Sequence, residues 1–376
     1  MQWRNVEDGE FEFSPRVNVL VGGNGQGKTN FLEALQYLAL GRSHRGSRDD
    51  EIVRFGADHF FVRGVGEGDA GESFSIEAGF TPPRSKRLRV DQQPLARLTD
   101  LLGVLACVSF GPEDSDLVRG GPQFRRRYVD YALAETSRSS LTLLSEYRRS
   151  VQQRAAWLRD GRRSDAELEH GLAVWDDEQV RLGCQVVSRR AEALADLAPR
   201  AGAVFAQLTD GMPLALRYAV HAAGRSFEVG EASAADLLGM LADGALAGAF
   251  RARLRERRAA ERARGVSLVG PHRDDVELVA GGRDLRRFGS QGQCRAAAVA
   301  LKMAQAEFIA ERRHERPVVV LDDVFAEFDE VRARSLWDAV CERHQTFLAV
   351  PRRSDLELGR AGALFRVESG RVTRES

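Results

Sequence analysis

The chain has 376 residues, and its 55 Lys+Arg balance its 55 Asp+Glu, so the formal net charge is +0 at pH 7. This length allows two or three lobes, and the charge balance removes any global electrostatic argument for nucleic-acid or membrane binding. The four cysteines lack metal-ligand spacing, and no apolar run approaches the roughly 18 residues of a membrane span. Composition therefore predicts a soluble cytoplasmic protein with reduced thiols, no membrane partner and only local polyanion sites.

The first motif, GGNGQGKT, occupies positions 22–29. A β-type run at 17–21 precedes it and a helical apolar pattern follows it, which is the context of the phosphate loop G-x-x-x-x-G-K-[ST]. Backbone N–H groups wrap a polyphosphate in such a loop, Lys28 reaches the outer phosphates, and Thr29 offers a hydroxyl to Mg²⁺. A dinucleotide fingerprint is disfavoured because Lys28 stands where its third glycine belongs. The residues expected to hold a nucleoside triphosphate are Gly22, Gly23, Asn24, Gly25, Gln26, Gly27, Lys28, Thr29 and Asn30.

The segments after the first helix predict an α/β fold with an insertion. Short alternating runs near 59–65, 73–80 and 86–90 indicate a flanking antiparallel β layer. A helical lobe is indicated by a charged, Ala/Leu-rich stretch from 124 to about 208 and by a second helical pattern from 233 to 264. A predicted strand at 214–220 lies between these two stretches. Strand signals then return after residue 265. The expected domains are 1–122, the first part of an ATPase head; 123–264, a mainly helical second lobe; and 265–376, the second part of the head.

The second motif is the acidic strand RPVVVLDDVF. Its apolar run, 318–321, predicts a central parallel strand whose two following acids lie at the sheet edge where ligands bind. There Asp322 would hold Mg²⁺ together with Thr29, and Asp323 would orient or deprotonate an attacking water. With Lys28 these two acids form the expected catalytic set.

The third motif, FGSQGQCRAAAVALK, places a polar turn before a buried helix at 288–302. Ser290 supplies a hydroxyl, Gly292 permits close backbone approach, and the helix N-terminus makes a second anion site. An ordinary helix cap by Ser290 explains the same residues. The turn by itself leaves both interpretations open.

Taken in order, GGNGQGKT, SQGQ and VVVLDDVFAEFD resemble the ABC-type ATPase heads of chromosome and DNA-repair proteins. The stretches FGPEDSDLVRGGPQFRRRYVD, GPHRDD and FGSQGQCRAAAVALKMAQAEF resemble, more narrowly, the RecF family of bacterial DNA replication and repair proteins. The resemblance implies a P-loop ABC-type ATPase head with an inserted helical lobe, and ATP with Mg²⁺ as ligands. It also implies ATP-dependent homodimerisation, in which the turn of the second subunit caps the γ-phosphate with Ser290, Gln291, Gly292 and Gln293.

The same resemblance implies function and partners. Members act in DNA replication, recombination, repair and the SOS response, bind gapped DNA near single-strand to double-strand junctions, and work with a RecR-like protein to load the recombinase. The sequence departs from the pattern of ABC-type heads at several positions, and these departures bear on the expected ATPase activity. Asp323 replaces the usual glutamate, which predicts slow ATP hydrolysis, and the resemblance implies that this weak ATPase is DNA-stimulated. The FGPED stretch lacks a metal-side glutamine, for which Glu113 or Asp114 could substitute, although surface acids in a turn are the favoured interpretation of these two residues. Ala349 and Val350 lack the hydroxyl of a switch contact.

Several residues stay open at this point. Arg4 and Asn5 stand where the family places nucleotide-side residues, and Asp329 fits either a dimer-interface loop or a helix cap. Two arginine clusters, at 124–128 and 251–264, could bind DNA phosphates, although solvated helix faces are the default for such runs. In GPHRDD, Pro271 fits a turn, and His272 with Arg273 could face phosphate or pair with Asp274 and Asp275.

Two other functions share these motifs. The ATP-driving subunit of a membrane transporter would carry the same loop, turn and acids, but the long helical lobe and the missing switch histidine disfavour it. A P-loop kinase or GTPase would leave the turn at 290–293 unexplained, and the guanine motif N-K-x-D is absent. The leading hypothesis is therefore a DNA-binding, dimerising ATPase of recombinational repair.

Overall fold

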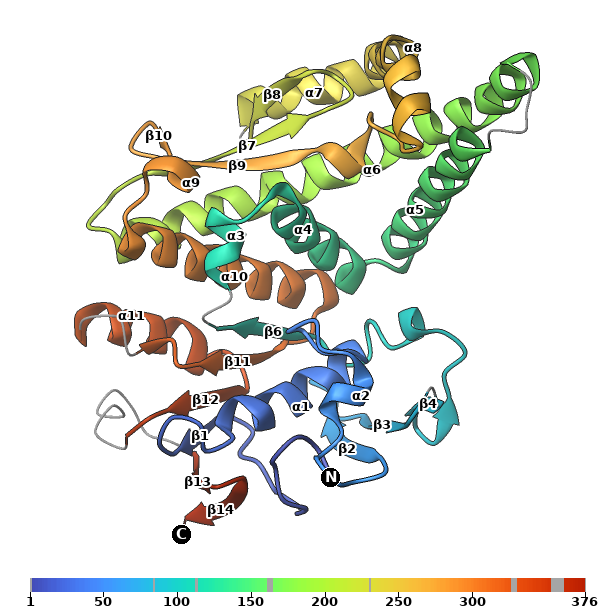
Figure 1. Ribbon diagram of the computed structural model, residues 1–376. Coiled ribbons are helices and arrows are strands. Elements are labelled where there is room, and N and C mark those ends of the chain that lie inside the picture. Colours follow the sequence, from blue (N-terminus) through green and yellow to red (C-terminus); the bar gives the residue numbers. More distant parts are fainter. Residues whose placement is uncertain are drawn as a thin grey trace. The chain divides into compact units, whose positions relative to one another are not determined.

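The computed structural model describes residues 2–83, 85–111, 114–160, 165–229, 231–325, 330–352 and 362–375. The chain divides into two compact units (Figure 1). The first comprises residues 1–114 and 305–376, and the second comprises residues 115–304. In the described part of the chain, no helix combines the length and apolarity needed to cross a membrane.

The first unit is built on a six-stranded sheet in the order β14-β13-β1-β12-β11-β6. Its strands are β1 Val17–Val21, β6 Cys107–Phe110, β11 Val318–Asp322, β12 Thr346–Val350, β13 Ala363–Glu368 and β14 Arg371–Glu375. Strand β11 lies parallel between β12 and β6, and β1 lies parallel between β12 and β13. The apolar runs of β1 and β11 are mostly buried, as expected for central parallel strands. The predicted α/β core is therefore confirmed.

A second, antiparallel sheet in the same unit has the order β2-β3-β4-β5. Its strands are β2 Phe60–Glu67, β3 Ser73–Thr81, β4 Ser85–Val90 and β5 Gln93–Pro94. Helix α1, Lys28–Leu40, contacts strands of both sheets. The ring of Trp3 packs edge-on against Tyr37 and Phe60, with centroids 5.0 and 4.9 Å away. The smaller elements of this unit are α2 Asp49–Ile52, η1 Leu98–Asp100 and α11 Glu330–Cys341.

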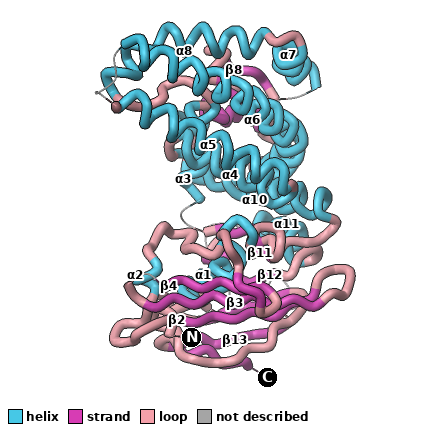
Figure 2. The backbone as a smooth tube through the Cα atoms, turned by 90° about the vertical axis from the view of Figure 1, so that its right-hand side faces the viewer, coloured by secondary structure: helices cyan, strands magenta, loops and turns pink. Residues whose placement is uncertain are grey.

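The second unit is mainly helical (Figure 2). Its helices are α3 Ser115–Arg119, α4 Pro122–Thr136, α5 Arg138–Arg159, α6 Asp165–Leu208, α7 Glu231–Ala242, α8 Ala245–Arg264, η3 Pro271–Arg273 and α9 Leu285–Phe288. Its antiparallel sheet has the order β10-β9-β7-β8, formed by β7 Leu214–Val220, β8 Arg225–Glu228, β9 Asp275–Ala280 and β10 Arg283–Asp284. Helix α10, Gln291–Arg313, carries the chain from this unit back to the first.

The boundaries of the compact units differ from the expected domain limits. Residues 265–304, expected in the second part of the head, belong to the second unit. The reason is strand pairing, because β9 is hydrogen-bonded to β7 along residues 275–280. A strand signal in the sequence predicts extended backbone but does not name the sheet that the strand joins.

Candidate nucleotide site

The loop after β1 has the backbone that a phosphate loop requires. Gly27 precedes the first residue of α1 and has a φ of 113°, in a region that favours glycine. At Gly22 a Cβ atom would lie 2.2 Å from the carbonyl oxygen of Val367, so only glycine fits beside β13. The loop therefore leads directly into a helix N-terminus, where backbone N–H groups favour an anion.

Lys28 is folded back onto this loop. Its Nζ donates hydrogen bonds to the carbonyl oxygens of Gly22 and Gly23, the latter 3.0 Å away. The side chain is buried, which lowers the pKa of the ammonium, while the charges of Asp323 and Asp322 oppose that shift. The two acids of the β11 motif thus lie within electrostatic reach of the loop lysine, as the sequence predicts.

Thr29 and Asp322 meet at the carboxyl end of β11. The Thr29 side chain faces the Asp322 carboxylate and acts to lower its pKa, but burial is the larger effect and raises the pKa of that carboxyl. A hydroxyl and a carboxylate at one point are oxygen ligands of the kind Mg²⁺ prefers, with remaining positions left for phosphate oxygens and water. The donor set therefore fits Mg²⁺.

Asp323 follows Asp322 in a strained conformation. Its φ is 55°, which is uncommon for a residue other than glycine, and its N–H donates to the carbonyl oxygen of Ala349 at 3.3 Å. One carboxylate oxygen, Oδ1, is buried and accepts no hydrogen bond within the described residues. A buried acceptor without a donor is costly, so this oxygen is suited to a water or substrate proton.

Sequence reasoning missed the support behind the loop. Glu33 of α1 is fully buried, and it accepts hydrogen bonds from the Arg4 guanidinium, at 2.5 and 3.0 Å, and from the Ser43 hydroxyl at 2.5 Å. Asn5 is also engaged, because its Oδ1 accepts from Asn30 Nδ2 at 2.7 Å. The signal for Glu33 was a lone acid on the apolar face of the predicted helix.

The loop is also tied to the turn between β13 and β14. The Ser369 N–H donates to Gln26 Oε1 at 2.6 Å, and the Gly370 N–H donates to the carbonyl oxygen of Gln26 at 2.8 Å. These bonds join residues far apart in the chain, so no local pattern indicated them. They fix the central part of the loop, which contains the expected ligand residues Asn24 and Gly25.

The polar turn before α10 belongs to the second unit. Ser290 Oγ accepts from the Gln293 N–H at 3.2 Å, and Gln293 Oε1 accepts from the Ser290 N–H at 2.9 Å. This reciprocal pair is a helix-capping box, and it leaves the Ser290 hydroxyl hydrogen for another acceptor. Gln291 and Gly292 are exposed at the helix start. The capping bonds and an anion-binding role are therefore compatible.

The GPHRDD stretch forms a buried polar network in the second unit. Asp274 is fully buried and accepts hydrogen bonds from the Tyr218 hydroxyl at 2.6 Å and the His221 N–H at 2.7 Å, with Arg190 at 3.6 Å. Burial raises the pKa of Asp274 to about 6, against the opposing charge of Arg190. This motif therefore holds the sheet to α6 by hydrogen bonds and ion pairs.

The same network corrects one hypothesis about DNA contacts. Arg125 pairs with Asp275 through bonds of 2.7 and 2.9 Å, and Arg126 donates to the carbonyl oxygen of Asp274 at 2.6 Å. Both guanidinium groups are thus engaged within the unit, and of these three arginines only Arg127 is exposed. The cluster at 124–128 is therefore not a free basic surface.

The remaining candidates are less informative. Asp114 Oδ2 accepts from the Gly111 N–H at 2.7 Å and so closes its own turn. Glu113 and Asp329 lie outside the described residues. Ala349 and Val350 are buried in β12.

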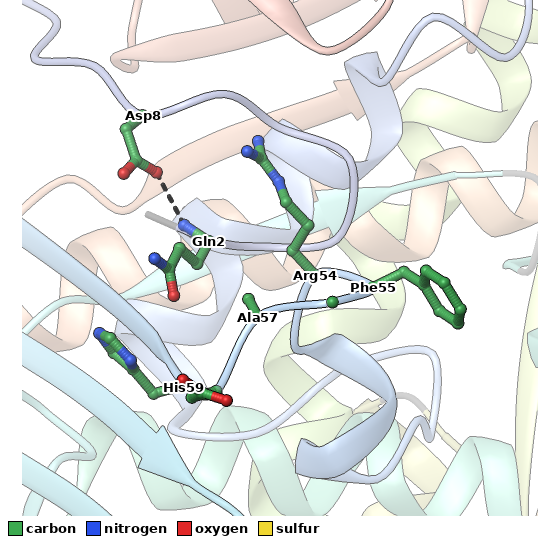
Figure 3. A pocket seen from close by; sticks show the side chains of 8 residues that line it. Gln2, Asp8, Arg54, Phe55, Ala57 and His59 are labelled. Carbon is green, nitrogen blue, oxygen red and sulfur yellow. Dashed lines mark hydrogen bonds between the residues drawn. The ribbon is translucent and has the colours of Figure 1, made fainter.

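A separate hollow of the first unit lies near the N-terminal segment (Figure 3). It is lined by Gln2, Asp8, Arg54, Phe55, Gly56, Ala57, Asp58 and His59. The Gln2 N–H donates to Asp8 Oδ1 at 2.8 Å, and the Phe55 ring is fully exposed. None of the predicted nucleotide residues lines this hollow, so it is distinct from the phosphate-loop site.

Comparison with known proteins places this geometry in a family. Residues 2–357 match the family model described as RecF/RecN/SMC N terminal domain. The DNA replication and repair protein RecF of Heliobacterium modesticaldum is 37% identical over 382 residues, which cover 100% of this chain and 97% of that protein. The chain belongs to the RecF family. The RecF protein of Symbiobacterium thermophilum is 39% identical, and the match covers 98% of this chain and 95% of that protein.

Solved structures agree with this membership. A structure titled as the recombination mediator protein RecF with ATP in the RecFOR pathway has a TM-score of 0.86 at 28% identity, covering 100% of this chain and 96% of that one. An Smc head bound to the C-terminal winged-helix domain of ScpA has a TM-score of 0.57 at 14% identity, covering 100% and 95%. The second likeness supports the ATPase-head fold alone. Membership in the RecF family favours the repair hypothesis over the transporter alternative.

Proposed function

We propose that this RecF-family chain binds ATP with Mg²⁺ and acts as a recombination mediator in the replication and repair of gapped DNA. The observation that carries the proposal is the meeting of Thr29 and Asp322 beside the buried ammonium of Lys28. A RecF structure that resembles this chain over its full length is titled as an ATP complex in the RecFOR pathway.

In this proposal each group at the site has a distinct task. The backbone of 22–29 and Asn30 hold the phosphates, and Lys28 exchanges its two carbonyl partners for phosphate oxygens. Thr29 and Asp322 hold Mg²⁺, which would neutralise charge on the phosphates. Asp323 orients the attacking water with its unpartnered oxygen. Because this acid is one methylene shorter than glutamate, we expect weak hydrolysis. We further propose, from family membership, that DNA stimulates it.

The proposed dimer completes the site. Ser290 to Gln293 of a second protomer would cap the γ-phosphate, using the free hydroxyl hydrogen of Ser290 and the exposed start of α10. ATP would then hold two copies together on DNA near a single-strand to double-strand junction. A RecR-like protein would be the partner through which the recombinase is loaded.

The test is the mass of the protein in solution, measured by size-exclusion chromatography with light scattering. With ATP, Mg²⁺ and gapped DNA we expect wild type to become a DNA-bound dimer. Lys28→Met and Ser290→Arg should both remain monomeric, whereas Ser145→Arg, the same change at an exposed serine of α5, should dimerise. A Ser290→Arg protein that dimerises with ATP as wild type does would refute capping by the second protomer.

A further inference from the structure

Helix α8 contacts the turn between β7 and β8, elements that Figure 1 labels, and three arginines and one histidine belong to this region. We call this group the turn cluster and define it as His221, Arg253, Arg257 and Arg273. The contact that fixes it is between Arg253 and Gly224, because a Cβ atom at Gly224 would lie 1.8 Å from Arg253 Nη1. Gly224 has a φ of 73°, so glycine both makes the turn and leaves room for the guanidinium.

Two polar atoms of the turn cluster have no internal partner. Arg253 Nε and His221 Nδ1 are both buried and make no hydrogen bond within the described part of the chain. Arg273 makes a hydrogen bond to a neutral acceptor, the carbonyl oxygen of Ser267, at 3.0 Å. Arg257 faces its exposed neighbour Glu256 at 3.6 Å, a pair that solvent screens strongly.

Other arginines of α8 differ in this respect. Arg251 pairs with Asp177 at 3.2 Å, and Arg258 pairs with Asp176 and, at 3.6 Å, with Glu169. These arginines bind acids of α6 and so stabilise the packing of two helices. The arginine run at 251–264 therefore contains arginines that pair with acids of α6 and others that lie near the turn between β7 and β8.

The local electrostatic field is positive. Burial lowers the pKa of His221, and the charges of Arg253, Arg273 and Arg257 lower it further. The acid next to this site, Asp274, is fully buried, accepts hydrogen bonds from Tyr218 and the His221 N–H, and is paired with the opposite charge of Arg190. The charge of Asp274 therefore does little to offset the positive charge of the three arginines. An anion bound from solution would offset it.

We infer that the turn cluster binds a backbone phosphate of a DNA strand, using the guanidinium groups of Arg253, Arg257 and Arg273 and the His221 ring. This inference rests on the proposed DNA-binding function and names a surface for it. A phosphate oxygen would accept from the exposed guanidinium groups of Arg257 and Arg273, and its negative charge would lower the cost of holding the Arg253 guanidinium, whose Nε is buried without an acceptor. Arginine forks suit phosphate because they donate two parallel hydrogen bonds. Inorganic phosphate shares this chemistry, so the experiment separates the two sources.

The experiment measures the affinity of the full chain for a labelled gapped duplex by fluorescence anisotropy over a range of salt concentrations. We expect Arg253→Gln and Arg273→Gln each to weaken binding about tenfold and to reduce the slope of log K against log salt by about 1. Arg253→Lys keeps the charge and should keep the slope. Arg255→Gln is the matched control, since Arg255 lies two residues along α8 on another face, and it should bind as wild type does.

Each outcome has one meaning. Wild-type affinity and slope in both glutamine variants, with wild type binding DNA, overturns the inference and leaves the proposed function intact. The inference is equally overturned if inorganic phosphate at matched ionic strength raises the melting temperature of wild type but not of Arg253→Gln, while DNA affinity is the same in both. If wild type itself fails to bind DNA with or without ATP, the proposed function fails. ATP affinity, measured with a fluorescent analogue, should be unchanged in every variant.

Discussion

The ammonium nitrogen of Lys28 lies 3.0 Å from the carbonyl oxygen of Gly23, inside the loop that the lysine is expected to serve. The Lys28 side chain is therefore already ordered against the loop. A bound phosphate would replace the carbonyl oxygens of Gly22 and Gly23 by phosphate oxygens as the acceptors of its hydrogen bonds. Because burial lowers the pKa of this ammonium, a negatively charged ligand should relieve an existing cost.

The first prediction follows from this contact. Lys28→Met keeps an unbranched side chain that is one atom shorter and removes its charge, so ATP affinity should fall by about 10- to 100-fold, as expected for lost charge-assisted hydrogen bonds. Titration of a fluorescent ATP analogue measures the change. The melting temperature without nucleotide should not fall, because the variant no longer buries a charge. Affinity within twofold of wild type would show that the loop lysine does not contact the phosphates.

The second prediction separates the two acids after β11. Burial raises the pKa of Asp322, so ionisation of this group disfavours the folded state at neutral pH. Asp322→Asn should therefore keep or increase the free energy of unfolding while the gain in ATP affinity on adding Mg²⁺ is lost. Asp323→Asn should retain that Mg²⁺ effect and lose hydrolysis by about 100-fold or more. Isothermal titration with and without Mg²⁺, and phosphate release, measure the two effects. Identical behaviour of the two variants would contradict the division of roles.

Several parts of this site could be predicted because their signals are local. The run at 17–21, the loop to Thr29 and the acids after β11 each combine a strand pattern with chemistry on neighbouring residues, and parallel strands bring their carboxyl ends to one edge. The α/β core and the antiparallel layer beside α1 followed from the same kind of pattern.

Other parts depend on partners far along the chain. Nothing near Asp274 in the sequence indicates Tyr218, which lies 56 positions away, so the sequence could not decide between a phosphate-facing and a paired role for His272 and Arg273. Arg125 looked like a free cation until its bonds to Asp275, 150 positions away, were known. Glu33 differs, because a lone acid on an apolar helix face predicts a buried partner, although not which residue provides it.

The third prediction concerns the support of the polar turn. Arg119 Nη2 donates to the carbonyl oxygen of Gly289 at 3.2 Å, immediately before Ser290. Arg119→Ala should loosen the turn and weaken ATP-driven dimerisation by about three- to tenfold, the cost expected for one modest hydrogen bond. Monomer affinity for ATP should stay the same. Sedimentation velocity at several protein concentrations measures dimerisation, and Arg127→Ala at an exposed position of α4 is the control. Equal dimerisation of both variants would remove Arg119 from any positioning role.

The fourth prediction is a pH dependence. His272 Nδ1 accepts from the Tyr147 hydroxyl at 2.8 Å, and Nε2 donates to the carbonyl oxygen of Ser267 at 3.0 Å, so the neutral ring satisfies both partners. Burial lowers the pKa of His272 to about 4. The unfolded chain takes up this proton near pH 6.5 and the folded chain only near 4, so the histidine contributes stability at neutral pH that is lost across that window as pH falls.

His272→Gln should therefore be less stable than wild type at pH 7, and the difference should shrink as the pH falls from 6.5 to 4. Asp274 works in the opposite sense, since its raised pKa favours the folded state at lower pH, so the comparison with wild type isolates the histidine. Urea unfolding at several pH values measures the difference. His170→Gln, at an exposed histidine of α6, should show no such convergence. A difference that stays constant with pH would mean that His272 is not neutral in the folded protein.

The fifth prediction tests the buried ion pair that links α5 to α8. Arg154 and Glu261 are both fully buried, and Arg154 Nη2 lies 2.6 Å from Glu261 Oε2. Arg154→Met leaves the Glu261 carboxylate with the Leu268 N–H, 2.7 Å away, and without its compensating charge. The free energy of unfolding should fall by about 3–5 kcal/mol, the cost of an uncompensated buried charge.

Urea unfolding measures this loss. Arg181→Met is the control, because the exposed Arg181–Glu178 pair should contribute less than about 1 kcal/mol. The double variant Arg154→Met/Glu261→Gln should recover part of the loss, since the Glu261 charge is removed and Asp176, the other acid paired with Arg154, keeps Arg258. If the single and double variants are equally unstable, packing around Arg154 rather than the charge of Glu261 accounts for the loss.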